Sequence, residues 1–227
     1  MSVKVAGVTH EAAKFAVLNW HYSKQMPIGK LIKYGVWENE KFIGVVLFGR
    51  GATPNLGKPY DLQQNELCEL VRVALDKHEA PVSQIVSKAI KNLKLHNTGL
   101  RLIVSFADPD QGHYGGIYQA GNWIYTGSSN AAKFFNIKGK KTHPRSVGAV
   151  GGIQSLNWIQ KNLDPKAEII ITAPKHRYLY PLDRTMRKKI IKIALPYPSA
   201  VEGLEESRID SVNKVQVQSL PTAQNFI

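Results

Sequence analysis

The apolar run from Leu100 to Phe106, which stops at Asp108-Pro109, is the feature that most restricts the fold of this chain. Its length and continuous hydrophobicity predict a buried strand, and proline cannot extend a hydrogen-bond ladder past that point. A polar, glycine-rich loop is expected next, then a short helical piece at 117–120 and a strand from Trp123. This order places the Asp108 carboxylate at the carboxyl end of a buried strand, where open α/β sheets have their binding sites.

Asp108 has two interpretations on the sequence alone. An aspartate before proline often only caps a turn, and for a single Asp-Pro pair that interpretation is favoured. The stretch from Val104 to Tyr125, however, gathers aspartate, histidine, tyrosine and glycine at high density, and it includes Tyr118. Such a grouping at a strand end also indicates a functional site. Both alternatives stay open.

The segment Leu67–Leu75 predicts a second strand with charges at core-like positions. Its residues alternate, with Glu69 on one face and Arg72 on the other. Burying either charge alone is costly, so each is expected to have a salt-bridge partner or a ligand.

A helix that opens at Pro81 is expected after this strand, because proline is favoured in the first turn. Its first amides, at Val82, Ser83 and Gln84, are candidates for binding an anion such as a cofactor phosphate. No glycine-rich loop precedes them, so the phosphate signal is weak.

Before these elements, the chain predicts a helix and a hairpin. Thr9 is a good N-cap for a helix that runs to about Tyr22, which places His21 and Tyr22 near its last turn. The helix dipole alone favours a histidine there. Strands are expected at Ile32–Trp37 and Phe42–Phe48. The order of elements predicts an α/β protein with a central mixed sheet flanked by helices.

The charge of the chain indicates the class of its partner. The 227 residues carry 30 Lys+Arg against 17 Asp+Glu, a net charge of +13, which favours a polyanion, most simply nucleic acid. Between Ala131 and Leu195 lie 14 basic residues and three acidic ones. The single Cys68 excludes an internal disulfide and suits a reducing cytoplasm, and no apolar run approaches the length of a membrane span.

We therefore expect a single domain over 1–195, with 131–195 as a basic, DNA-facing C-terminal elaboration, and an extension over 196–227. The stretch Lys175–Arg184, which we expect to be a loop that contacts DNA, interleaves basic and aromatic residues, which suits phosphate contacts and base stacking. The helix expected from Thr185 to Leu195 has an apolar face for packing. The residues predicted to contact nucleic acid are Lys140, Lys141, Arg145, Lys175, His176, Arg177, Tyr178, Arg184, Arg187 and Lys188.

Several segments carry a resemblance to known families: Trp20-His21-Tyr22-Ser23, Glu69–Leu75, Ser105-Phe106-Ala107-Asp108, Gly115–Ala120 with Asn122–Tyr125, and Lys175-His176-Arg177-Tyr178 with Pro181-Leu182-Asp183. The order of elements resembles the GNAT acetyltransferase superfamily, in which a long strand and the following helix bind the pyrophosphate of acyl-CoA. More closely, the chain resembles the Mom proteins of bacteriophages, which modify adenine in phage DNA.

The resemblance implies an enzyme that makes N6-carbamoylmethyl-adenine in double-stranded DNA and so protects phage DNA from restriction, in the cytoplasm of the bacterial host. It implies iron, with His21, Tyr22, Asp108 and Tyr118 as ligands, and it places Arg72 and Ser83 near the cofactor or substrate. Such ligands suit iron. One departure argues against an acyl-CoA-type donor, because His78–Ser83 is not glycine-rich and Pro81 lacks an N–H.

Reaching adenine N6 in a duplex requires base flipping. In that reaction Asp108 is either a metal ligand or a general base on the exocyclic amine. Two rival functions stay open: an acetyl-CoA-dependent N-acyltransferase acting on protein or RNA, and a non-catalytic DNA-binding protein. The oligomeric state is also open, with a homodimer among the alternatives.

Overall fold

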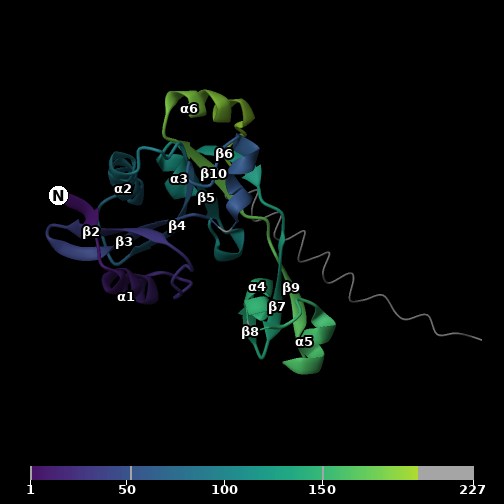
Figure 1. Cartoon of the computed structure of the whole chain (residues 1–227). Helices are drawn as coiled ribbons and strands as arrows, with labels where there is room; N and C mark the ends of the chain where they lie inside the picture. Colours follow the sequence, from purple (N-terminus) through teal and green to yellow (C-terminus); the bar gives the residue numbers. More distant parts are fainter. Residues whose placement is uncertain (1, 52, 150, 199–227) are drawn as a thin grey trace, which may run out of the picture. The chain divides into compact units, whose positions relative to one another are not determined.

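The computed structural model describes residues 2–51, 53–149 and 151–198. All described helices and strands lie in one unit, Met1–Leu195; Pro196–Ile227 forms a second unit, and most of the expected C-terminal extension lies outside the described residues. The main sheet of the first unit has seven strands in the order β1-β2-β3-β4-β5-β10-β6 (Figure 1). These strands are β1 (Val3–Gly7), β2 (Leu31–Glu38), β3 (Lys41–Gly49), β4 (Leu67–Leu75), β5 (Leu102–Ala107), β6 (Ile124–Ser128) and β10 (His176–Pro181).

One parallel pair interrupts an otherwise antiparallel sheet. β4 pairs with β5 only over Leu67–Glu69 and Leu102–Val104, although β4 continues to Leu75. Beyond that short ladder the backbones of the two strands are no longer hydrogen-bonded to each other along their length. The carboxyl end of β5 is thereby left beside an opening in the sheet, where other elements can contribute side chains.

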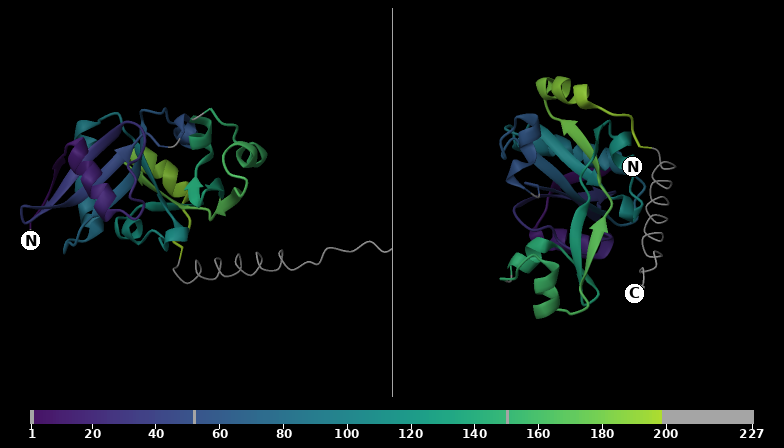
Figure 2. Two further views of the ribbon diagram at one scale, coloured as in Figure 1. Left: turned by 90° about the horizontal axis from the view of Figure 1, so that it is seen from below. Right: turned by 90° about the vertical axis from the view of Figure 1, so that its right-hand side faces the viewer.

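Helices cover both faces of the sheet, as Figures 1 and 2 show. α1 (His10–Trp20) buries Ala13, Ala16 and Val17 against β3 and β4. α2 (Val82–His96) packs its apolar stripe into the larger core on the opposite face. Two shorter helices, α3 (Gly116–Ala120) and α6 (Arg184–Ile190), follow β5 and β10. The α/β class with a mixed central sheet flanked by helices is confirmed.

A second sheet, in the order β8-β7-β9, is formed by the part of the chain that lies between β6 and β10 in the sequence. Its buried residues Phe135, Val147, Ile159 and Ala167 form a core of their own. We call residues 132–172 the inserted module. Its elements are β7 (Ala132–Ile137), β8 (Lys140–Thr142), α4 (Pro144–Ala149), α5 (Leu156–Asn162) and β9 (Glu168–Thr172).

Two sequence predictions were wrong in ways that affect the site. The basic-aromatic stretch was expected to be a loop, but its first part is β10, which pairs with β5 on one side and β6 on the other. The strict alternation of β4 also fails, because Leu47 pairs with Arg72 and Phe48 with Leu70. The extra residue, Val71, makes a bulge that reverses which face the later side chains occupy.

Two other expectations, the N-cap of the first helix and a long strand followed by a helix, were met. Thr9 caps α1, with its hydroxyl oxygen accepting a hydrogen bond from Ala12 N at 3.3 Å. The resemblance to the acetyltransferases predicted a long strand followed by a helix, and β4 and α2 are that pair. In the part of the chain that the structure describes, no helix has the length and apolar character needed to cross a membrane.

Candidate functional site

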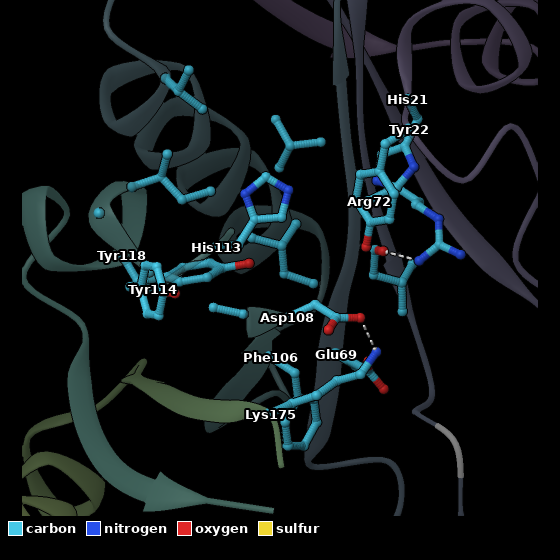
Figure 3. Close-up of a pocket in the computed structure, with 18 of the residues that line it drawn as sticks. His21, Tyr22, Glu69, Arg72, Phe106, Asp108, His113, Tyr114, Tyr118 and Lys175 are labelled. Carbon is cyan, nitrogen blue, oxygen red and sulfur yellow. Dashed lines mark hydrogen bonds and ion pairs between the residues drawn. The ribbon is translucent and has the colours of Figure 1, made fainter. Parts of the chain in front are cut away.

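A pocket of about 930 Å³ lies where β4 and β5 stop pairing. Residues from six regions line it: the end of α1, Thr53 and Leu56 after β3, β4 from Glu69 onward, His78 and Val82 near the start of α2, the end of β5 with its following loop and α3, and the segments at Ser129 and Lys175. The fold therefore brings His21 and Tyr22 into the same pocket as Asp108, although some 85 positions separate them in the sequence. The predicted site required His21 and Tyr22 to lie near Asp108, and Figure 3 shows all three residues at the same pocket.

Asp108 both caps a turn and faces the pocket. Its Oδ1 accepts a hydrogen bond from Asp110 N at 3.2 Å, at the start of a 3₁₀ turn over Pro109–Gln111. Its Oδ2 lies 2.7 Å from Lys175 Nζ, and the aspartate side chain is only 15% exposed. The two interpretations left open by the sequence are therefore compatible, because one oxygen fixes the turn while the other forms an ion pair inside the pocket.

His21 and Tyr22 form the opposite side of the pocket in Figure 3. Ser23 N donates a hydrogen bond to His21 Nδ1 at 3.1 Å, so that nitrogen acts as an acceptor. Burial, together with the positive charge of Arg72 and the nearby His113, lowers the pKa of His21 to about 4. At neutral pH His21 is therefore uncharged, and the tautomer that matches the Ser23 contact has its proton on Nε2. The Tyr22 ring is exposed and stands 5.4 Å from the His113 ring.

Arg72 contributes an unsatisfied donor to this side. Its Nη1 donates to the Val71 carbonyl oxygen at 2.6 Å, but its buried Nε has no hydrogen-bond partner among the described residues. The bulge at Val71 sets the face of β4 on which Arg72 lies. A buried guanidinium N–H without a partner is costly, which makes Arg72 a natural contact for an anionic or carbonyl group in the pocket.

Tyr118 lies deep beside the pocket with its hydroxyl already engaged. The hydroxyl oxygen is 2.7 Å from Ser105 Oγ, which also donates to the Leu70 carbonyl oxygen at 2.8 Å. Its ring stacks on Tyr178, with ring centroids 5.0 Å apart. Burial raises the pKa of Tyr118 to about 12, so the phenolate form is disfavoured.

The four residues expected to bind iron, His21, Tyr22, Asp108 and Tyr118, all line the pocket. Three of them also have partners within the protein: His21 Nδ1 accepts a hydrogen bond from Ser23 N, both Asp108 oxygens have partners, and the Tyr118 hydroxyl lies beside Ser105 Oγ. A metal ligand must be deprotonated, and burial disfavours the phenolate form of Tyr118. Iron binding by these residues stays a prediction.

The residues predicted to contact DNA separate into two groups. His176 is 7% exposed and Tyr178 is fully buried, so neither is available to DNA in this structure. Arg177 donates from Nε and Nη2 to Thr126 in β6, and Lys175 pairs with Asp108. Assigning this stretch to a DNA-facing loop is corrected by its place in β10. The predicted contacts that are exposed are Lys140, Lys141 and Arg145 in the inserted module and Arg184, Arg187 and Lys188 in α6.

The predicted cofactor-binding residues Val82, Ser83 and Gln84 form the first turn of α2. Val82 lines the pocket. Gln84 N donates to the Pro81 carbonyl oxygen at 2.9 Å, so that amide is satisfied within the helix. The turn has no side-chain cap.

Some pocket residues were missed by sequence reasoning. His113 and Tyr114 belong to the stretch after Asp108 but were not among the predicted site residues; the structure shows that both line the pocket. Tyr178 Oη donates to the Tyr114 carbonyl oxygen at 2.6 Å and holds this loop against β10. Gly115 makes the close approach possible, since its φ is +90° and a Cβ there would lie 2.3 Å from the Tyr178 ring.

Comparison with known proteins identifies relatives for most of the chain. The Mom protein family matches residues 2–199. The methylcarbamoylase Mom of Escherichia phage Mu is 26% identical over 206 residues, which cover 86% of this chain and 83% of that protein.

Solved structures with a similar arrangement include acetyltransferases. A Bacillus subtilis acetyltransferase in complex with CoA matches with a TM-score of 0.44 and 14% identity, over 80% of this chain and 98% of that one. The aminoglycoside 6′-N-acetyltransferase of Enterococcus faecium has a TM-score of 0.44 and 10% identity, over 88% and 100% of the two chains.

Proposed function

Since this chain belongs to the Mom protein family, we propose that it is a transferase that modifies adenine in double-stranded DNA. The modification that we propose is the addition of a carbamoylmethyl group to N6, which would protect phage DNA from restriction enzymes in the host cytoplasm. The family match over residues 2–199 is the observation that carries this proposal. The name of the phage Mu relative, a methylcarbamoylase, supports a carbamoylmethyl group as the group that is transferred.

The pocket is suited to an extruded base. A duplex hides adenine N6 in the base stack, so the nucleotide must leave the helix and enter a cavity. A volume of about 930 Å³ accommodates a nucleoside together with a second small molecule. The rings of Tyr22, His113 and Tyr114 offer aromatic surfaces on which a base can stack.

We assign to Asp108 the role of the base that accepts the proton from adenine N6. As N6 forms its bond to the methylene carbon, the bond from that carbon to the donor's leaving group breaks and its electron pair goes to the leaving group. N6 then loses a proton, which the Asp108 carboxylate accepts. The ammonium group of Lys175, 2.7 Å from Oδ2, holds the carboxylate in place before the base arrives.

The DNA backbone has candidate contacts on the inserted module. The module joins the main sheet through the segments at Ser129 and Lys175, and both of these residues line the pocket. Ser129 N donates to the Lys175 carbonyl oxygen at 2.8 Å, which ties the two connections together. The exposed Lys140, Lys141 and Arg145 of the module supply positive charge for phosphate groups.

The proposal is tested by expressing the protein in bacteria and analysing the nucleosides of the host DNA by mass spectrometry. We expect a deoxyadenosine in which a carbamoylmethyl group replaces one hydrogen, and fragmentation should place the group on the base. DNA from cells with an empty vector is the control. An unmodified adenine pool in cells that contain folded protein would contradict the proposal and would favour a DNA-binding protein without catalytic activity.

A further inference from the structure

Two short connections, residues 129–131 and 173–175, join the inserted module to the main sheet, and we call them the neck. Neither connection belongs to a helix or a strand. The first follows β6 and the second leads into β10, and one residue of each, Ser129 and Lys175, lines the pocket. The place of Lys175 in the pocket therefore depends on how these irregular segments are held.

Ser129 and Lys175 form a modified strand pair. They lie one step beyond the pair of Ser128 and His176, which is the outermost pair that β6 and β10 make at this end. In a regular antiparallel hydrogen-bonded pair, each residue donates its N–H to the carbonyl oxygen of the other. Ser129 N does donate to the Lys175 carbonyl oxygen, at 2.8 Å, but Lys175 N donates to the Ser129 hydroxyl oxygen, at 3.0 Å. The Ser129 side chain thus takes the place of a ladder carbonyl.

A second contact orients this hydroxyl. Ser129 Oγ donates to the Asn130 carbonyl oxygen at 3.1 Å, so its proton is directed there and a lone pair is left to accept from Lys175 N. An alanine at this position would remove the acceptor although it is close to serine in size. The pairing therefore requires a hydroxyl group, and not only a small side chain.

The backbone of Lys175 depends on Ser129 in particular. Among the described residues, Ser129 supplies both hydrogen bonds to that backbone. Pro174, the preceding residue, has no N–H with which to extend the ladder. The next fixed point is at the far end of the neck, where the Thr172 hydroxyl donates to the Ala132 carbonyl oxygen at 3.2 Å.

The side chain of Lys175 carries this placement to Asp108. Its Nζ lies 2.7 Å from Asp108 Oδ2, and the lysine side chain is 39% exposed (Figure 3). A long, partly exposed side chain loses rotamer freedom when it is held in one ion pair, so the pair is sensitive to where its backbone starts. A displacement of about 1 Å in a group that positions a reaction is enough to lower the rate strongly.

We propose that Ser129 is a positioning residue, whose hydroxyl sets the backbone of Lys175 so that the ammonium group reaches Asp108. The inference rests on the proposed function, because it takes Asp108 as the base. It also makes the effect of Ser129 conditional on Lys175. Without the ammonium group, the Ser129 hydroxyl has no further effect on the reaction.

Adenine modification in cells, measured soon after induction by mass spectrometry of DNA, tests the proposal. Ser129→Ala is expected to lower the modified fraction about fivefold, the effect of one lost hydrogen bond, and Ser129→Thr, which keeps the hydroxyl, should recover it. In a Lys175→Ala background, Ser129→Ala should cause no further loss. Ser128→Ala is the matched control, because it removes a neighbouring hydroxyl that lies 3.4 Å from His176 Nδ1, and it should resemble the wild type.

A second measurement needs no modifying activity. Purified full-length protein is treated with sulfo-N-hydroxysuccinimide acetate, and acetylation of each lysine is followed by peptide mass spectrometry. The ion pair should protect Lys175 relative to the exposed Lys161. Ser129→Ala should raise the rate at Lys175 about fivefold, toward the rate in Asp108→Asn, and leave Lys161 unchanged.

Three results would overturn the proposal: wild-type modification by Ser129→Ala, an equal loss from Ser129→Ala in both backgrounds, or unchanged acetylation of Lys175 in a Ser129→Ala protein that circular dichroism shows to be folded. If Ser129→Ala does not fold, Ser129→Cys replaces it, because a thiol is only a weak acceptor. Unmodified adenine in cells with the wild-type protein would instead be a failure of the proposed function. The acetylation rates would then decide alone whether Ser129 holds Lys175 against Asp108.

Discussion

Replacing Lys175 with alanine separates two roles for this residue. The sequence suggested a contact with the DNA backbone, whereas the structure pairs its ammonium group with Asp108 Oδ2 at 2.7 Å. If the ion pair is the main role, Lys175→Ala should reduce adenine modification and leave DNA binding intact. If a phosphate contact is the main role, DNA binding should weaken instead.

The expected sizes of the two effects differ enough to be measured. The Lys175 and Asp108 side chains are 39% and 15% exposed, so solvent screens the pair in part. We therefore assign about 1.4 kcal/mol to the lost positioning, which corresponds to an approximately tenfold loss of rate. Loss of one phosphate contact would lower the slope of log affinity against log salt by about 1.

Two measurements on matched variants decide between the roles. Fluorescence anisotropy with a labelled duplex at several salt concentrations gives the slope, and mass spectrometry of cellular DNA gives the modified fraction. Lys175→Ala should keep the wild-type slope and lose modification, Lys175→Arg should recover modification, and Lys140→Ala should reduce the slope. A reduced slope in Lys175→Ala with unchanged modification would refute the positioning role.

The remaining predictions concern the pocket walls. Folding lowers the pKa of His21 from 6.5 to about 4, so between these pH values the unfolded chain binds a proton that the folded protein does not. The free energy of unfolding should therefore be full above pH 6.5 and fall by about 1–2 kcal/mol as the pH drops toward 4. Urea unfolding across this range should show the loss in wild type and less of it in His21→Gln; identical pH dependence would contradict it. Tyr118→Phe should cost about 1 kcal/mol, since Ser105 keeps another acceptor, and should retain adenine modification; loss of modification with intact fold would instead support a ligand role. Gly115→Ala should lower stability by about 2 kcal/mol in the same urea assay, because the new Cβ meets the Tyr178 ring. Gly116→Ala is the control, since its Cβ has no described atom within 4 Å, and it should leave stability unchanged. Equal losses of stability in the two variants would refute the packing argument.

Local patterns were sufficient to predict much of the first half of the fold. Thr9 as an N-cap, the apolar run of β5 and the opening of α2 after Pro81 each depend on residues close together in sequence. The α/β class follows from their order. The placement of Asp108 at the end of a buried strand followed in the same way, because the Asp-Pro pair ends the ladder locally.

Long-range features were not accessible from the sequence. The stretch after Lys175 becomes a strand only because β5 and β6 provide hydrogen-bonding partners on both sides. The bulge at Val71 is a property of the pairing between β3 and β4, and no residue within β4 signals it. The contacts of Lys175 with Asp108 and of Glu38 with the β4–α2 loop join residues far apart in the chain, and acidic or basic side chains alone do not reveal their partners.

The most direct test of the account compares adenine modification in cells that express Asp108→Asn and Asp110→Asn. Asp108 faces the pocket as a carboxylate, whereas Asp110 is an exposed acidic residue of the same turn. We predict that the Asp108→Asn protein, folded and able to bind DNA, leaves deoxyadenosine unmodified, and that Asp110→Asn modifies it like the wild type. Undiminished modification by Asp108→Asn would contradict the central role of this carboxylate.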